Sequence, residues 1–123
     1  MEALNLLGLA AALATFLGVW FGHVAVRRIE FSTQQIHLPM LLFLFTGLAL
    51  LACSTQVESH LVSAVLGILG ITCLWDALEV MRQQQRVKRG HAPANPHNPR
   101  HLKILREFPA ATTTDFLKRE PQD

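Results

Sequence analysis

The sequence predicts an all-α integral membrane protein with three transmembrane helices. Three stretches, residues 3–26, 31–57 and 59–75, contain no Asp, Glu, Lys or Arg. Nine of the eleven Lys and Arg residues lie at or after Arg82, and the other two are Arg27 and Arg28. A helix on the surface of a soluble protein carries a polar face along its length, which these stretches lack. The alternative is a soluble bundle of unusually apolar helices.

The first span is predicted at about residues 4–26, a run dominated by Ala and Leu. At about 1.5 Å per residue it reaches about 34 Å, enough to cross a hydrocarbon core of about 30 Å. We expect Arg27 and Arg28 to end it. The start "MEALN" has no positive charge and the apolar run is long, so we expect an uncleaved span rather than a signal peptide.

The second and third spans are predicted at about 37–54 and 60–80, joined by the short polar turn "STQVESH". Pro39 suits the first turn of a helix, where its missing N–H is not needed. We expect the third helix to continue into the cytosol, with Glu79 and Arg82 close enough to pair at their three-residue spacing. Gly90 is a candidate helix end. Residues 1–89 therefore form the predicted transmembrane unit with its helix extension.

The remaining residues, 90–123, are predicted to be a strap rich in Pro and Asn followed by a basic, partly disordered tail. The segment "GHAPANPHNPRH" is dense in prolines, which are incompatible with a regular helix. The segment "LKILREF", 102–108, is a candidate short helix, and we expect the polar end to be mobile. The positive residues flank the first and third spans on one side only. They predict an N-terminus outside and a C-terminus in the cytosol.

Several segments resemble a family of small bacterial integral membrane proteins catalogued as a domain of unknown function. The similarity covers about residues 16–99 and is carried by "FGHVAVRRIEF", "LGILGITCLW" (66–75) and "GHAPANP" (90–96). The resemblance implies a three-span bacterial membrane protein and no activity. We expect the protein to lie in the bacterial cytoplasmic membrane.

Polar side chains gather at the predicted cytosolic boundary. The members of this predicted boundary cluster are Trp20, His23, Arg27, Arg28, Glu30, His37, Trp75, Asp76 and Glu79. Tryptophan belts and charges at headgroup depth are usual at a membrane interface, and Arg27 or Arg28 paired with Asp76 or Glu79 would join the first helix to the third. The alternatives are a polar pocket for a lipid or quinone headgroup, a proton path, a metal site or a haem ligated by His23 and His37.

Small residues predict the helix-packing positions. Gly18 and Gly22 are four residues apart, as are Ser63 and Gly67, with Gly70 following. Such spacing lets two helix backbones approach closely in a membrane. Residues expected to face lipid or a partner come from the third helix and the strap: Arg82, Arg86, Lys88, Arg89, Pro93, Asn95 and Pro96.

No motif for nucleophilic, phosphate-binding or metalloprotease chemistry is present, so we expect no enzyme activity, catalytic residue, cofactor or metal. The tail has few aromatic groups for stacking, and nucleic-acid binding is not expected. The hypothesis is a non-enzymatic accessory or scaffold subunit that associates with other membrane subunits, with itself or with anionic lipid of the cytosolic leaflet. The alternative is an oligomeric small-molecule or ion carrier, with copies associated through Gly18 and Gly22.

Overall fold

The computed structural model describes residues 3–117 and 120–121, with the side chains of the last pair not described. Its elements are α1 (Leu7–Ser32), α2 (His37–Ser54), α3 (His60–Lys88), α4 (Pro99–Glu107), β1 (Thr114–Asp115) and β2 (Glu120–Pro121). α1, α2 and α3 are long and apolar enough to cross a membrane. The predicted all-α architecture with three spans is confirmed, and the chain is a multi-pass membrane protein.

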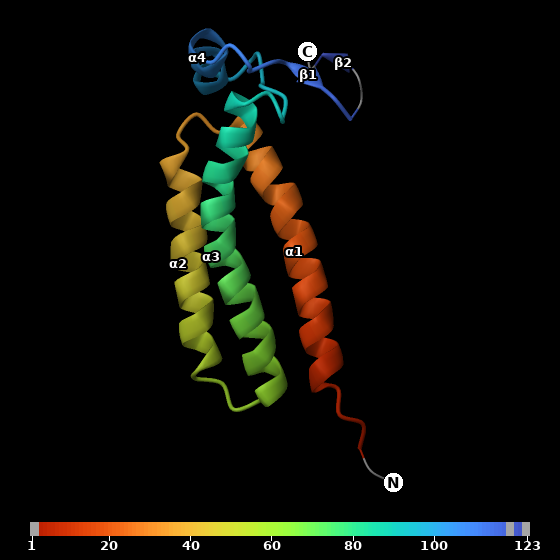
Figure 1. The fold of residues 1–123 in the computed structure, drawn as a ribbon. Helices are drawn as coiled ribbons and strands as arrows, with labels where there is room; N and C mark the ends of the chain where they lie inside the picture. The colour runs from red at the N-terminus through yellow and green to blue at the C-terminus, as the bar shows by residue number, and fades with distance from the viewer. Residues whose placement is uncertain (1–2, 118–119, 122–123) are drawn as a thin grey trace.

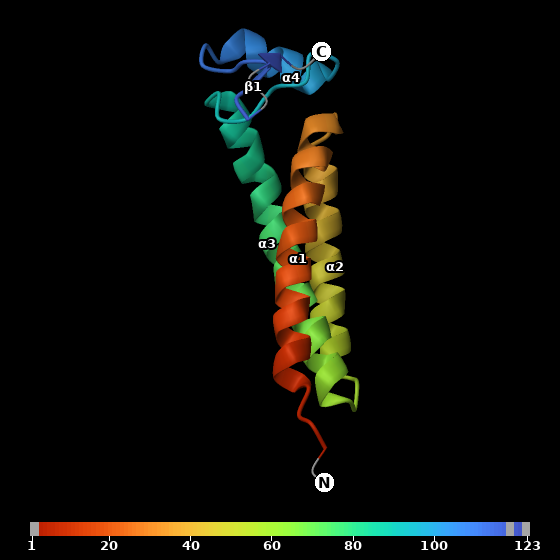
Figure 2. The same ribbon diagram turned by 90° about the vertical axis from the view of Figure 1, so that its right-hand side faces the viewer.

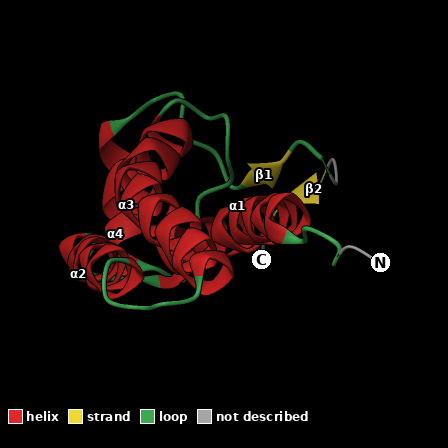
Figure 3. Cartoon of the chain, turned by 90° about the horizontal axis from the view of Figure 1, so that it is seen from below, coloured by secondary structure: helices red, strands yellow, loops and turns green. Residues whose placement is uncertain are grey.

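The three long helices form an open layer rather than a closed bundle. α3 lies between α1 and α2 and makes nearly all of the contacts between the long helices (Figure 1). Viewed along the helices, α1 and α2 lie on opposite sides of α3 (Figure 3). The spans therefore bury few of their apolar side chains on one another, and Phe45 on α2 and Phe16 on α1 are more than half exposed. Lipid or another protein must cover these faces.

Glycines set the close contacts within the layer. A side-chain carbon on Gly47 would lie 2.8 Å from the carbonyl oxygen of Gly70, and one on Gly70 would lie 2.9 Å from Leu51. Gly47, on α2, was not among the predicted packing residues. Gly18 and Gly22 on α1 face α3, where an added carbon on Gly22 would lie 2.7 Å from the carboxylate oxygens of Asp76.

The other two predicted packing residues differ in their surroundings. The Ser63 hydroxyl donates to the Ser54 carbonyl at 2.7 Å and so joins α3 to the end of α2. Gly67 has open space where a side chain would begin, so within one chain it is not a close-contact position. Small residues at a spacing of four mark several faces of α3, and only the placement of the neighbouring helices decides which face is used.

α1 does not end at its arginine pair. The arginine pair that we expected to end the first span follows its apolar run, but the helix continues through Arg27 and Arg28 to Ser32. Arginine is a good helix former, and charge at the membrane edge ends a span without ending a helix. α2 has the predicted bounds, and α3 continues to Lys88 as expected.

A C-terminal cap, defined here as residues 90–117, lies across one end of the helix layer (Figures 1 and 2). It begins at Gly90, whose φ of 77° is in the left-handed region. The His91 N–H donates to the Arg86 carbonyl at 2.8 Å and the Gly90 N–H to the Val87 carbonyl at 3.1 Å. This pattern is a Schellman motif and confirms Gly90 as the predicted helix end.

The cap has its own small core. Buried Ala92, Ala94 and Ile104 pack against Val87 at the end of α3. Residues 90–98 of the strap are irregular, as their prolines predict. The expected short helix is present as α4, but it begins at Pro99 rather than at residue 102, so the prediction of an irregular segment is wrong for residues 99–101. Asn98 caps this helix, and Pro99 is tolerated in its first turn, where its missing N–H is not needed. β1 and β2 form a two-residue antiparallel pair that was not predicted. Residues 118–119 and 122–123 of the predicted mobile tail lie outside the described residues.

Candidate functional site: a buried clamp and a cationic cleft at the capped end

The cap is fixed to α1 through one buried carboxylate. The Glu30 side chain is 1% exposed, and its Oε1 atom lies 2.9 Å from Nη2 of Arg100 and 2.9 Å from Nε2 of His101. The His101 side chain is fully buried. A charge taken this far from water is tolerated in a protein only when it is paired and hydrogen-bonded. Both partners come from α4, so burial of Glu30 depends on docking of the cap.

The hydrogen bonds assign the tautomer of His101. Its Nδ1 atom accepts from the Asn95 N–H at 2.7 Å, so the proton of the neutral imidazole is on Nε2. That N–H then donates to the Glu30 carboxylate at 2.9 Å. Nε2 and the Arg100 guanidinium lie 3.1 Å apart as two donors that converge on one oxygen. His101 therefore joins the strap and α1 through its two ring nitrogens.

Strap side chains also satisfy the free carbonyls at the end of α1. Asn95 and Asn98 each donate from Nδ2 to the Phe31 carbonyl at 3.1 Å, and Asn98 also donates to the Thr33 carbonyl at 2.9 Å. Arg100 donates from Nε to the same Thr33 carbonyl at 3.1 Å and from Nη2 to the carbonyl of Glu30. The last carbonyls of a helix have no partner within it, so the cap acts as the C-terminal capping group of α1.

We call Glu30, Asn95, Asn98, Arg100 and His101 the clamp. It also reaches α3, because Arg100 Nη1 donates to Gln84 Oε1 at 2.6 Å. Within the described part of the chain, every buried side-chain nitrogen and oxygen has a hydrogen-bond partner. A fully satisfied polar network of this kind favours a single geometry, because any displacement leaves a buried group unpaired. The orientation of the cap relative to α1 and α3 is therefore fixed.

The predicted boundary cluster does not form one site. Glu30 belongs to the clamp. Glu79 is buried and pairs within α3, with Arg82 at 3.3 Å and Arg86 at 3.1 Å, so the expected Glu79–Arg82 pair is confirmed. The proposed pairing of Arg27 or Arg28 with Asp76 or Glu79 is wrong, since no such ion pair occurs among the described residues.

The remaining members of the predicted cluster are spread around the capped end of the layer. Asp76 is buried against Gly22, and His23 is exposed on α1. Trp20 and Trp75 are about half exposed, and Trp20 contacts Phe21 with ring centroids 4.9 Å apart. His37 is exposed at the start of α2. Among residues 3–117 and 120–121, no group of three or more His, Cys, Asp or Glu is placed to hold a metal ion.

The residues expected to face lipid or a partner differ in how exposed they are. Arg82, Arg86 and Arg89 are exposed, with the Arg82 guanidinium stacked 4.8 Å from the Trp75 ring. The Lys88 ammonium lies 5.0 Å from the Phe108 ring, and Pro93 and Pro96 are half-buried. Asn95 instead turns inward to the end of α1, so its assignment to the outer face is wrong. The free carbonyls of the helix end are the stronger partner for its amide.

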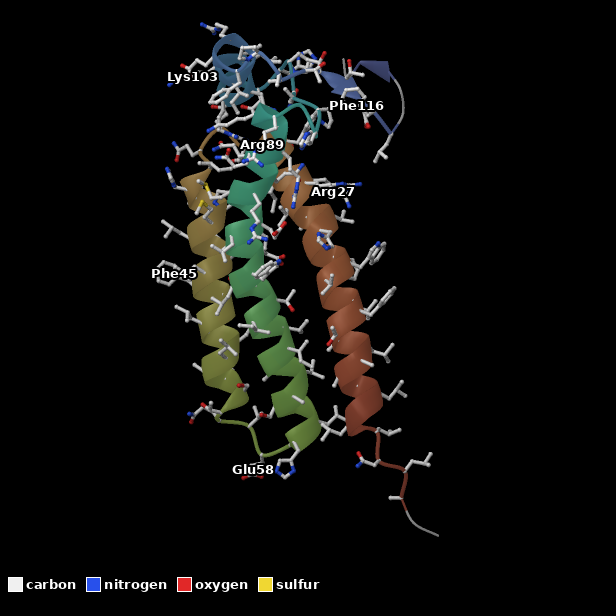
Figure 4. The ribbon with its side chains drawn as sticks, viewed as in Figure 1. Arg27, Phe45, Glu58, Arg89, Lys103 and Phe116 are labelled. Atoms are coloured by element: carbon white, nitrogen blue, oxygen red, sulfur yellow. The ribbon has the colours of Figure 1, made fainter. Side chains whose placement is uncertain are left out.

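A cleft of about 850 Å³ opens beside the clamp, between α1, α3 and the two ends of the cap. Its α1 wall carries His23, Arg27 and Arg28, and its α3 wall carries Arg86. Phe116 and its neighbours form the roof. Figure 4 shows Arg27 and Phe116 on the same side of the molecule, at the capped end of α1, with Lys103 on the opposite side of the cap.

Sequence reasoning missed Asn98, Arg100 and His101 as site residues. His101 lies next to the proline-rich strap, where no residue pattern marks a histidine for burial, yet it is fully buried. The available signals were the Asn-Pro pair at 98–99, which marks a helix start, and the single Glu30 between apolar Ile29 and Phe31. Nothing in the sequence connects Glu30 to residues about seventy positions away.

The chain belongs to the family described as "Domain of unknown function (DUF4491)", which it matches over residues 5–98. The matched range includes the three spans, Glu30, Asn95 and Asn98, and it ends just before Arg100 and His101. No curated protein and no solved structure matches the chain.

Proposed function

We propose that the protein is a non-enzymatic accessory or scaffold subunit that holds a rigid cap at the surface of the bacterial cytoplasmic membrane. The observation that carries the proposal is the clamp. A buried, fully hydrogen-bonded ionic network fixes the cap to the ends of α1 and α3. Such a network is a weak source of stability, and its best-attested use is to select one arrangement over others. A fixed arrangement serves a surface that presents itself to other molecules.

The open helix layer supports the same proposal. α1 and α2 lie on opposite sides of α3, and their outer faces expose large apolar residues such as Phe16, Trp20 and Phe45. In a membrane these faces are free to pack against lipid or against the helices of a larger complex. The carrier alternative required copies to associate through Gly18 and Gly22, but those glycines already face α3 of the same chain. We therefore favour the accessory role.

Orientation is part of the proposal. The exposed cations at the capped end would contact the anionic lipids of the cytosolic leaflet, with the N-terminus and the α2–α3 turn outside. Glu58 and Lys103 lie at opposite ends of the molecule (Figure 4). With Cys53 and Cys73 replaced by alanine, Glu58→Cys should react with a membrane-impermeant thiol reagent added to intact spheroplasts, and Lys103→Cys only after lysis. The reverse pattern would overturn the orientation.

Co-purification tests the accessory role. The tagged protein is extracted from its native membrane in mild detergent, and the proteins that accompany it are identified by mass spectrometry. Glu30→Ala opens the clamp, whereas Glu107→Ala removes a cap carboxylate whose pairing with Lys103 is exposed and 3.9 Å long. We expect a stoichiometric partner with the wild type and Glu107→Ala and its loss with Glu30→Ala. Recovery of the wild type without any partner protein would overturn the accessory role.

A further inference from the structure

We propose that the cleft between α1, α3 and the cap binds the phosphate headgroup of one acidic phospholipid. This inference rests on the lipid-associated part of the proposed function and assigns it a site. The accessory role and the lipid site are separable, because a protein without partner subunits would still present the same cleft.

The walls carry unneutralised positive charge. Arg27 and Arg28 are exposed on the last turns of α1, and neither makes an ion pair with another described side chain. The carboxylate of Glu30 also borders the cleft, but it is buried and neutralised by Arg100 at 2.9 Å. Guanidinium groups recognise phosphate through paired N–H donors.

The other titratable groups that line the cleft leave its net charge positive. Arg86 is matched by Glu79 at 3.1 Å, and the histidines His23 and His91 add donors rather than negative charge. Asp115 lies on the roof and is the one acidic residue of the lining besides Glu30 among those described. The two arginines of α1 therefore make the net charge of the cleft positive.

The roof is apolar in a part of the molecule that is otherwise polar. Phe116 is 65% exposed and Leu117 is 90% exposed, beside Ala92 and Pro93 of the strap. β1 and β2 lie beyond the end of α1, on the side of the cap opposite α4, and close to α1 in the view along the helices (Figures 1 and 3). Exposed Phe and Leu beside cations, at the level where an apolar span ends, are the features of a segment that sits in the headgroup zone.

The cleft is continuous with the lipid-facing side of α1. Below His23, α1 presents Leu17, Trp20 and Phe21, each 44% exposed or more. A phospholipid with its phosphate between Arg27 and Arg28 would place its acyl chains along this face. A volume of about 850 Å³ is within the range of ligand sites, about 300–1,000 Å³, and exceeds the needs of a lone phosphate ion.

The test uses native mass spectrometry of the full-length protein titrated in mild detergent with phosphatidylglycerol or phosphatidylcholine. We expect one phosphatidylglycerol to bind preferentially and Arg27→Gln/Arg28→Gln to weaken its binding about twenty-fivefold, since each basic residue near an anionic lipid contributes roughly fivefold. The matched control, Lys103→Gln/Arg106→Gln, removes the same charge from exposed positions on α4 that do not line the cleft. It should bind like the wild type.

A second variant tests the roof without changing charge. Phe116→Ser should weaken phosphatidylglycerol binding severalfold, and folding of all variants is checked by their melting temperature in detergent. If the α4 control weakened phosphatidylglycerol binding equally, the effect would be one of overall net charge, and the site would be overturned. Equal binding of the two lipids would overturn it as well. Displacement of the lipid by millimolar inorganic phosphate would assign the cleft to a soluble anion instead.

Discussion

Replacing Glu30 with alanine should release the cap from the helix layer while the spans stay folded. The Glu30 carboxylate is the common acceptor of Arg100 and His101, both at 2.9 Å, and all three side chains are almost fully buried. Removal of one partner of a buried ion pair raises the free energy of the folded arrangement by about 3–5 kcal/mol, because the other charge stays buried without compensation. The free energy of cap opening should fall by that amount.

Hydrogen exchange measures the opening directly. The Asn95 N–H is held by His101 at 2.7 Å, and the Ala94 N–H by the Thr112 carbonyl at 2.8 Å. Both amides should exchange about a hundred- to several thousandfold faster in Glu30→Ala, since every 1.4 kcal/mol changes an opening equilibrium about tenfold. Amides at the centre of α3 should exchange as in the wild type.

Glu107→Ala is the matched control for the same cap. Its pair with Lys103 is 3.9 Å long and both side chains are more than half exposed, so the variant should change the opening free energy by less than about 0.5 kcal/mol. Arg100→Ala should resemble Glu30→Ala, and the double variant should be less affected than the sum of the two. Unchanged exchange of Asn95 and Ala94 in Glu30→Ala would refute the reasoning that the cap depends on this buried pair.

Other predictions concern the packing and the two ends of the strap. Gly70→Ala places a carbon 2.9 Å from Leu51 and should lower the free energy of unfolding in detergent by about 1–3 kcal/mol, whereas Gly67→Ala meets open space and should be neutral or slightly stabilising in the same titration. Gly90 has a φ of 77°, which costs an alanine about 1–2 kcal/mol, and the added carbon of Gly90→Ala would also collide with the carbonyl of Ala110. The variant should therefore speed exchange of the strap amides. Asn98→Ala removes the N-terminal cap of α4 and one of the two donors to each of the Phe31 and Thr33 carbonyls. Cap opening should therefore become easier by about 2–4 kcal/mol by the same exchange measurement. Wild-type behaviour of Gly70→Ala, or equal effects of Gly67→Ala, would contradict the assigned packing face.

The helices that cross the membrane could be predicted from sequence because each depends on a local property. A helix satisfies its own backbone hydrogen bonds, so a long run of apolar residues is enough to define a span in lipid. The bounds of α2 and the continuation of α3 to Lys88, just before Gly90, followed from such runs and from turn residues. The end of α1 could not be predicted in this way, because Arg27 and Arg28 end an apolar run but allow the helix to continue.

The packing faces and the clamp could not be predicted in the same way. Gly67 and Gly70 look alike in the sequence, and only the position of α2 decides that Gly70 is the one in contact. Glu30 and His101 are 71 residues apart, and each is an ordinary polar residue near a boundary until the cap folds back over α1.

The sequence by itself determined the number of spans, their limits near the membrane edges and the irregular strap with its short helix. Those features follow from hydropathy and from the backbone preferences of Pro and Gly, which act over a few residues. The tertiary structure decided which helix lies in the middle of the layer, which carbonyls the strap asparagines satisfy and where the two arginines of α1 meet an apolar roof. These features depend on groups that come together from distant parts of the chain. Those groups are buried only after folding, and burial is what makes their hydrogen bonds and charges matter to the free energy.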